Sequence, residues 1–330
     1  MSLFSTAKAL EERWLAVWFR PEPTLPLELI RIGVGSALLL AYGSASAHLF
    51  ELFGDQGWIS RTAFLAETAS PWMPSVFFYL TAPWQWIVFH AFFLLATAAV
   101  TVGWQTAWLK WVVLIFHVSY LNRNPAITYG VDDLLASLLF LLCFAPVGRA
   151  LSLDRRLMLR KAIRPDQTTR STPFTSAWGF ACQRLIQLQM AIFYFFAGVE
   201  KLQGESWWQG YALWIALTNY EYATIPLGWL AEHFWIINLS TYYTLLLELA
   251  FPFLVWGRPT RPYLLAGACL LQVGIALLLG LYLFSFVVIL GLLSFLRPEW
   301  LAQRRATLAT VRPQLKPILG VTSQDGENRT

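Results

Sequence analysis

Charged residues are scarce in this chain of 330 residues, because Asp, Glu, Lys and Arg together make up only 13% of it. An ordinary globular domain carries roughly 25% charge. Apolar residues make up 57%, and the mean hydropathy is +0.52. This composition excludes a typical water-soluble domain and indicates a membrane protein. The formal net charge of +5 is spread over the loops, which favours a membrane topology, with lipid as a partner, over binding to nucleic acid.

Cysteine is also rare. The three cysteines lie far apart in apolar segments (Cys143, Cys182 and Cys269). Their spacing fits neither a metal site nor a disulfide framework, so we expect inert thiols and no metal. The sequence contains no P-loop, no dinucleotide-binding fingerprint and no nucleophile elbow.

Long apolar runs dominate instead. About 20 apolar residues cross a bilayer core. The predicted fold class is therefore all-α, a polytopic transmembrane helical bundle of about eight spans with no large soluble domain. The runs are 26–48, 84–104, 106–121, 132–147, 177–201, 234–256, 262–280 and 282–297. The last two runs together are too long for one crossing, so we expect a turn near Gly280.

Three regions follow from these runs. They are an interfacial amphipathic segment (1–23), a transmembrane domain (24–300) and a polar, partly disordered cytoplasmic tail (301–330). The first segment is charged and places Leu10, Trp14 and Trp18 at four-residue steps. That pattern is more typical of a helix lying on the membrane than of a secretory signal.

Lysine and arginine in short loops predict the orientation. They cluster in 148–176, in 257–261 and in the tail. Eight spans with a cytoplasmic N-terminus place all three clusters inside, so we expect both termini in the cytoplasm. We expect an integral membrane protein with its polar site toward the outer face.

Lys201 closes the apolar run 177–201 and carries the main functional hypothesis. Polar or small residues lead up to it at steps of three and four and share one helix face. They are Arg184, Gln187, Ala191, Tyr194 and Gly198. Polar groups avoid hydrocarbon, so this face should look inward. It could hold helices together, or it could line a site.

A lysine held in a dry environment can be neutral near pH 7 and act as a base. Glu200 precedes Lys201 and points about 100° away around the helix. If Glu200 paired directly with Lys201, it would keep the lysine charged and oppose that role. The sequence leaves both arrangements open.

Further polar candidates lie outside this run. The loop after 106–121 contains Asn124, Tyr129, Asp132 and Asp133. Helix capping explains one of the two acids but not both. Trp208 follows Lys201 in an aromatic loop that fits a membrane-interface belt or the wall of a pocket for a flat ring.

Glu248 lies in the middle of a span, which makes it a functional candidate by default. Arg31 and Gln272 are its candidate structural partners. His48 and His90 are lone histidines on apolar faces, which indicates satisfied interior or interfacial residues more than catalysts.

Four strings are similar to the HTTM family, a bacterial membrane family related to the vitamin K-dependent γ-carboxylase. The resemblance covers about residues 24–300, and its most specific part ends in Lys201. The strings are Gly54-Asp-Gln-Gly-Trp58, Asn122-Arg-Asn-Pro125 with Tyr129-Gly-Val-Asp-Asp133, Pro146 through Asp154, and Tyr194-Phe-Phe-Ala-Gly-Val-Glu-Lys201-Leu.

The resemblance implies a chemistry in which Lys201 is the base. It takes a proton from a reduced naphthoquinone of the vitamin K or menaquinol type. Dioxygen then adds, an epoxide forms, and a strongly basic intermediate removes a proton from a substrate glutamate, to which carbon dioxide adds. The implied partners are a lipophilic quinone and a secreted peptide, and the implied location is a bacterial inner membrane.

The sequence also departs from the carboxylase. Asn124 is the nearest candidate where the carboxylase has a histidine, Gln272 stands where histidine is expected in many relatives, and no large soluble domain follows the membrane part. We therefore expect a quinol-linked enzyme in which carboxylation is optional. One alternative is a membrane factor for maturing or exporting a peptide without a quinone. Another is a non-enzymatic transporter or scaffold, which Arg184, Gln187 and Glu248 would suit if they formed a conduction path.

Overall fold

The computed structural model describes residues 3–60, 62–63, 66, 74–161, 174–219 and 227–296, and within these ranges the chain is almost entirely helical. The strands there are two short ones, β1 (Glu22–Pro23) and β2 (Thr175–Ser176), which pair antiparallel. This pair ties the chain before one long helix to the chain before another. The predicted all-α bundle is confirmed.

Each of the eight predicted apolar runs overlaps a helix. They are α2 (Leu25–Ala45), α5 (Pro83–Val102), α6 (Thr106–Arg123), α7 (Gly130–Phe144), α10 (Ala177–Leu202), α13 (Phe234–Leu254), α14 (Arg261–Leu279) and α15 (Tyr282–Leu292). Gly280 takes the left-handed conformation, with φ of 69°, between α14 and α15. The predicted turn at this point is therefore confirmed.

Five helices in the described ranges are long and apolar enough to cross a membrane. They are α2 with its continuation to Phe53, α5, α10, α13 and α14. The other three are less suited to a full crossing. At 1.5 Å per residue, α7 spans about 22 Å of a core that is about 30 Å thick. The total of eight spans remains a prediction.

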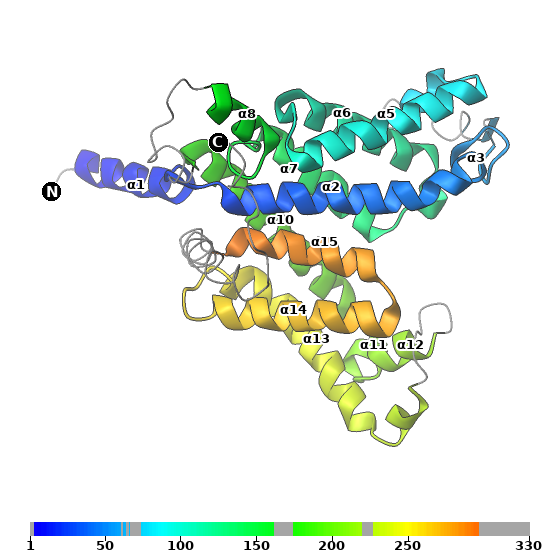
Figure 1. Ribbon diagram of the computed structural model, residues 1–330. Coiled ribbons are helices and arrows are strands. Elements are labelled where there is room, and N and C mark those ends of the chain that lie inside the picture. Colours follow the sequence, from blue (N-terminus) through cyan, green and yellow to red (C-terminus); the bar gives the residue numbers. More distant parts are fainter. Residues whose placement is uncertain are drawn as a thin grey trace, which may run out of the picture.

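Shorter helices join or flank these. They are α1 (Leu3–Trp18), α3 (Leu49–Phe53), α8 (Leu153–Lys161), α11 (Glu205–Trp208) and α12 (Ala212–Thr218), with 3₁₀ turns η1 (Ser46–His48), η2 (Val76–Tyr79), η3 (Pro125–Ile127), η4 (Gly228–Ala231) and η5 (Leu293–Phe295). Helix α1 projects from the bundle (Figure 1). Its Leu10 and Trp14 side chains are exposed. Its interfacial role stays a prediction, and the predicted tail 301–330 lies outside the described residues.

The long helices form two groups, which Figure 1 shows above and below the axis of α2. Helices α2, α5, α6 and α7 make the first group, and α10, α13, α14 and α15 make the second. Helix α15 joins them because it packs against α14 on one side and against α2 and α7 on the other. Fully buried apolar side chains such as Ile30, Phe93 and Phe251 fill the core between the helices.

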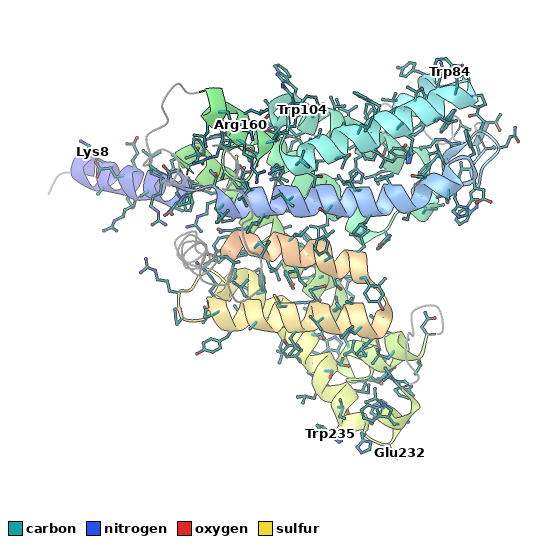
Figure 2. The ribbon with its side chains drawn as sticks, in the orientation of Figure 1. Lys8, Trp84, Trp104, Arg160, Glu232 and Trp235 are labelled. Carbon is teal, nitrogen blue, oxygen red and sulfur yellow. The ribbon has the colours of Figure 1, made fainter. Side chains whose placement is uncertain are left out.

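Exposed tryptophans mark the ends of the bundle. Trp84 and Trp104 lie at opposite ends of α5, and Trp235 lies at the tip of α13 (Figure 2). All three are among the exposed side chains. Indole rings favour the membrane–water interface, so their placement at the helix ends fits a bundle that crosses a bilayer.

Candidate functional site

Lys201 lies in the last turn of α10, as predicted, and meets Glu248 of α13. Its Nζ is 2.8 Å from Glu248 Oε2 and 3.3 Å from the Ala197 carbonyl. The Lys201 side chain is 24% exposed and that of Glu248 is 9% exposed. The two charges form an ion pair in a half-buried position between helices of the second group.

A small residue permits this approach. Gly198 lies one turn before Lys201, and a Cβ atom built at Gly198 would be 2.9 Å from Leu249 Cδ2. A glycine in a membrane helix lets a neighbouring helix come close. Helix α13 therefore packs directly on α10 beside the ion pair.

The inward face predicted for α10 is confirmed, because Gln187, Ala191, Tyr194 and Gly198 are all buried. The Tyr194 ring stacks on Phe251, with centroids 4.2 Å apart. Gln272 of α14 is 2% exposed and lies near the Tyr194 hydroxyl. The inner wall of the site thus combines residues from α10, α13 and α14.

The aromatic residue beside the lysine differs from the expectation. The Lys201 Nζ lies 5.3 Å from the Trp207 ring centroid, a cation–π distance. Trp208 is 60% exposed, and its indole N–H donates to the Leu202 carbonyl at 2.7 Å. Adjacent tryptophans in a short helix point in different directions, and the sequence alone did not show which one faced inward.

Glu200 is exposed, and Glu248 is the acid paired with Lys201. The alternative in which Arg31 neutralises Glu248 is wrong. The Arg31 Nε donates to Glu28 Oε2 at 3.0 Å, and both side chains are almost fully buried. Arg31 belongs to α2, in the first group, and has its own carboxylate one turn away on the same helix.

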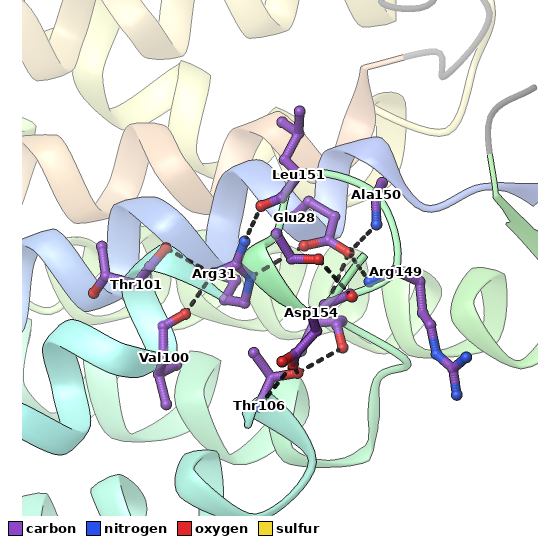
Figure 3. A network of polar contacts seen from close by, with 12 residues as sticks. Glu28, Arg31, Val100, Thr101, Thr106, Arg149, Ala150, Leu151 and Asp154 are labelled. Carbon is purple, nitrogen blue, oxygen red and sulfur yellow. Dashed lines mark hydrogen bonds and ion pairs between the residues drawn. The ribbon is translucent and has the colours of Figure 1, made fainter. Parts of the chain in front are cut away.

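Glu28 and Arg31 organise the loop 146–154 (Figure 3). Glu28 Oε1 accepts backbone N–H groups from residues 148, 149 and 150 at 2.8–3.0 Å. Arg31 donates to the carbonyls of Val100, Thr101 and Leu151. Asp154 accepts from the N–H groups of Gln105 and Thr106. This family-like string therefore joins α2, α5 and α6 and has a structural role.

The string Asn122–Pro125 also makes structural contacts. Asn124 is fully buried, and its Nδ2 donates to the Leu52 carbonyl at 2.6 Å. Arg123 donates to the carbonyls of Gly54 and Ile59 at 2.6 and 3.0 Å. Two of the family-like strings thus meet in the first group, where Asn124 binds the last turn of α3 and Arg123 binds the chain after it.

Tyr129, Asp132 and Asp133 stand at the start of α7. The Tyr129 N–H donates to Asp132 Oδ2 at 3.0 Å, so Asp132 caps the helix. Asp133 is exposed, as is Tyr129 at 46%. Partial burial, and then the nearby Asp132 carboxylate, raise the pKa of Tyr129. Their contacts do not reach Lys201 within the described part of the chain.

Arg184 and Gln187 bind backbone. Gln183 and Gln187 both donate to the Ser294 carbonyl at 2.6 Å. Arg184 donates to Gln187 Oε1 at 2.9 Å and to the Val17 carbonyl at 3.3 Å. Arg184 and Gln187, at the start of the polar face of α10, therefore attach this helix to η5 and α1. At this end the polar face holds helices together, which was one of the two roles considered for it.

The histidines have partners that the sequence did not reveal. His90 Nδ1 is 2.7 Å from the Tyr120 hydroxyl, and His117 Nδ1 is 2.9 Å from the Tyr42 hydroxyl. His90 is thus a satisfied interior residue, as predicted, whereas His48 is exposed and pairs with Glu51. The periodicity of an apolar helix does not predict which residue on another helix a histidine will meet.

A small cavity lies elsewhere in the bundle. Its lining includes Arg31, Leu38, Lys110 and Leu142, and it touches neither Lys201 nor Glu248. Lys110 donates to the Ala145 carbonyl at the end of α7. The described ranges contain no group of three or more His, Cys, Asp or Glu side chains placed to hold a metal.

The apolar helices and the polar groups enclosed between them define an integral membrane protein with a helical-bundle fold. A family model, the HTTM domain, matches residues 19–300. The chain belongs to the HTTM family. No curated protein and no solved structure matches it.

Proposed function

We propose that this protein is a quinol-linked membrane enzyme in which Lys201 takes a proton from a reduced naphthoquinone. Dioxygen would oxidise the resulting anion, with one oxygen atom entering the epoxide and the other leaving as water, as in the vitamin K-dependent carboxylase. The observation that supports the proposal is the half-buried pair of Lys201 and Glu248, 2.8 Å apart, in an HTTM-family chain. A helical bundle can dissolve the quinone and exclude water from a strong base.

The proposed reaction must also give a role to Glu248, the carboxylate that pairs with Lys201. In water the pair is an ammonium and a carboxylate. When a bound ring excludes water, two separate charges become costly, and the proton moves from Lys201 Nζ to Glu248 Oε2. The neutral amine then accepts the hydroxyl proton of the quinol. Glu248 acts as the temporary proton holder, and the ion pair becomes compatible with a base role.

The finer parts of the function extend the same proposal. The epoxidation would be coupled to modification of a secreted peptide at the outer face, with carbon dioxide as co-substrate where carboxylation occurs. The membrane would be a bacterial inner membrane with both chain ends in the cytoplasm. Trp207 would cover the lysine, and Tyr194 and Gln272 would line the inner wall.

A conduction path is less well supported. Transport through the bundle would need polar groups that follow one another across it. Gln187 and Arg184 are held by backbone carbonyls, and Glu248 pairs with Lys201. Each polar group has a local partner, which favours a fixed site over a pathway.

The test is epoxide formation by purified protein given reduced menaquinone and oxygen, measured by mass spectrometry. Wild type and Lys8→Ala, a control at an exposed lysine, should form the epoxide. Lys201→Ala should not. Lys201→Arg should also fail while keeping the ion pair, because a guanidinium does not lose its proton.

Two outcomes would count against the proposal. Equal epoxide from wild type and Lys201→Ala would remove the base role. Absence of epoxide from all variants would favour the peptide-maturation and scaffold alternatives.

A further inference from the structure

Two arginine side chains lie over one buried aromatic ring where α1 meets α10. The guanidinium carbons of Arg20 and Arg184 are 5.3 and 4.8 Å from the Phe180 ring centroid, which are cation–π distances. Arg20 lies in the link between α1 and β1, and α10 contacts both of these elements. The two positive groups therefore share one edge of the bundle, next to the helix that projects from it (Figure 1).

Positive charge exceeds negative charge around this ring. The Arg20 Nε is 2.6 Å from Glu22 Oε1. Arg261, at the start of α14, and Arg20 both repel the Arg184 guanidinium, whereas Glu22 attracts it. Three arginines and one glutamate thus interact at this place. Arg20, Arg184 and Arg261 are called the arginine cluster below.

Two N–H donor groups beside the cluster have no acceptor in the described part of the chain. Arg184 donates from Nε to the Val17 carbonyl and from Nη1 to Gln187 Oε1, and its Nη2 has no hydrogen bond there. Trp18 ends α1, and its Nε1–H is buried and unpaired. A buried donor without an acceptor is costly, and native proteins leave few of them. These donors indicate an acceptor from outside the chain.

The chemistry of the cluster favours a phosphate group at the membrane surface. Guanidinium groups pair well with phosphate oxygens, which only accept hydrogen bonds. Basic clusters at the cytoplasmic side of membrane helices bind the headgroups of anionic lipids, and the lysines and arginines of the loops predict that this end faces the cytoplasm. Leu10 and Trp14 are exposed on α1 and give it an apolar surface suited to the acyl chains beside such headgroups.

We propose that the arginine cluster and Trp18 bind the headgroup phosphate of an anionic phospholipid and so fix α1 on the membrane surface. Arg184 and Lys201 both belong to α10. Seventeen residues separate them along the chain, which corresponds to roughly 25 Å of helix. The lipid site is therefore distinct from the Lys201 site and does not depend on the proposed reaction.

Thermal unfolding in detergent with added lipid tests this site. Dioleoylphosphatidylglycerol and dioleoylphosphatidylcholine have the same acyl chains, but only the first has a net negative headgroup. A ligand that binds the folded state raises the unfolding temperature, and native mass spectrometry counts the lipids retained. Wild type should be stabilised by phosphatidylglycerol and retain it, whereas phosphatidylcholine and inorganic phosphate at the same concentration should have little effect.

Three variants and one control locate the effect. Arg20→Gln and Arg184→Gln should each weaken phosphatidylglycerol binding roughly fivefold, the contribution of about one basic residue near a charged membrane surface. Trp18→Phe keeps an aromatic ring but removes the N–H group, and should weaken binding roughly threefold. Arg160→Gln is the matched control, because it removes the same charge from an exposed side chain of α8 (Figure 2). It should bind like wild type.

Each variant is compared with its own lipid-free unfolding temperature, so a loss of stability alone does not count as lost binding. Equal stabilisation by the two lipids would assign the effect to the acyl chains and overturn the proposal. Equal weakening by Arg160→Gln and Arg184→Gln would show that diffuse surface charge attracts the lipid. Stabilisation by inorganic phosphate as large as that by phosphatidylglycerol would identify a site for a free anion. Either of these results, or unchanged binding in all three variants, also refutes the proposed lipid site.

Discussion

Glu28→Gln should destabilise the protein strongly although it changes only one functional group. Glu28 is fully buried, accepts three backbone N–H groups through Oε1, and pairs with Arg31 through Oε2. The amide keeps the size and one acceptor oxygen. Its NH₂ group then faces the Arg31 Nε–H, which places two donors together and leaves a buried guanidinium without an anion.

The burial of the Glu28–Arg31 pair determines how much stability Glu28→Gln should lose. Removing one partner of a buried ion pair costs about 3–5 kcal/mol, because the other charge stays buried without compensation. Glu51→Gln is the same substitution in an exposed pair with His48, where both side chains are more than 60% exposed. Exposed pairs contribute about 0–1 kcal/mol, so this control should unfold almost like wild type.

Intrinsic fluorescence from the 17 tryptophans can follow unfolding of both variants in detergent. Glu28→Gln should lose several times more stability than Glu51→Gln. If the two variants unfold within error of each other, the loop 146–154 does not depend on the Glu28 carboxylate and the reasoning is refuted.

Two further predictions concern the surroundings of Lys201, both read out by epoxide formation. Gly198→Val should push α13 away from α10 and abolish activity, whereas Gly43→Val should not, because a Cβ at Gly43 meets no atom within 4 Å; equal activity would show that close helix contact is unimportant. Trp207→Leu should reduce activity more than Trp208→Leu, because only the Trp207 ring lies over Nζ. The reverse order would place the functional indole at Trp208.

Much of the architecture follows from local patterns in the sequence. The apolar runs predicted where the long helices lie, since a bilayer core demands continuous apolar stretches. Gly280 marked the turn between α14 and α15, because its left-handed conformation suits glycine. The three- and four-residue steps toward Lys201 showed that one face of α10 looks inward.

The partners of the polar side chains were harder to predict. Helical periodicity shows which way a side chain points, but it does not show which residue the side chain meets. The sequence identified Glu248 as an unusual intramembrane acid. It did not identify Lys201 as the partner of Glu248, and Arg31 was one of the candidates. The structure places Arg31 beside Glu28 in the other helix group. Asn124 was expected near the site but holds the Leu52 carbonyl instead.

The sequence by itself determined that this is a membrane helix bundle with a lysine at the end of an inward-facing stripe, because composition and helical period are local properties. Only the tertiary structure decided that this lysine meets Glu248 and Trp207, and that Tyr194 and Gln272 lie behind the pair. Those contacts depend on how α10, α13 and α14 cross. The crossing is set by the packing of small and large side chains between distant segments.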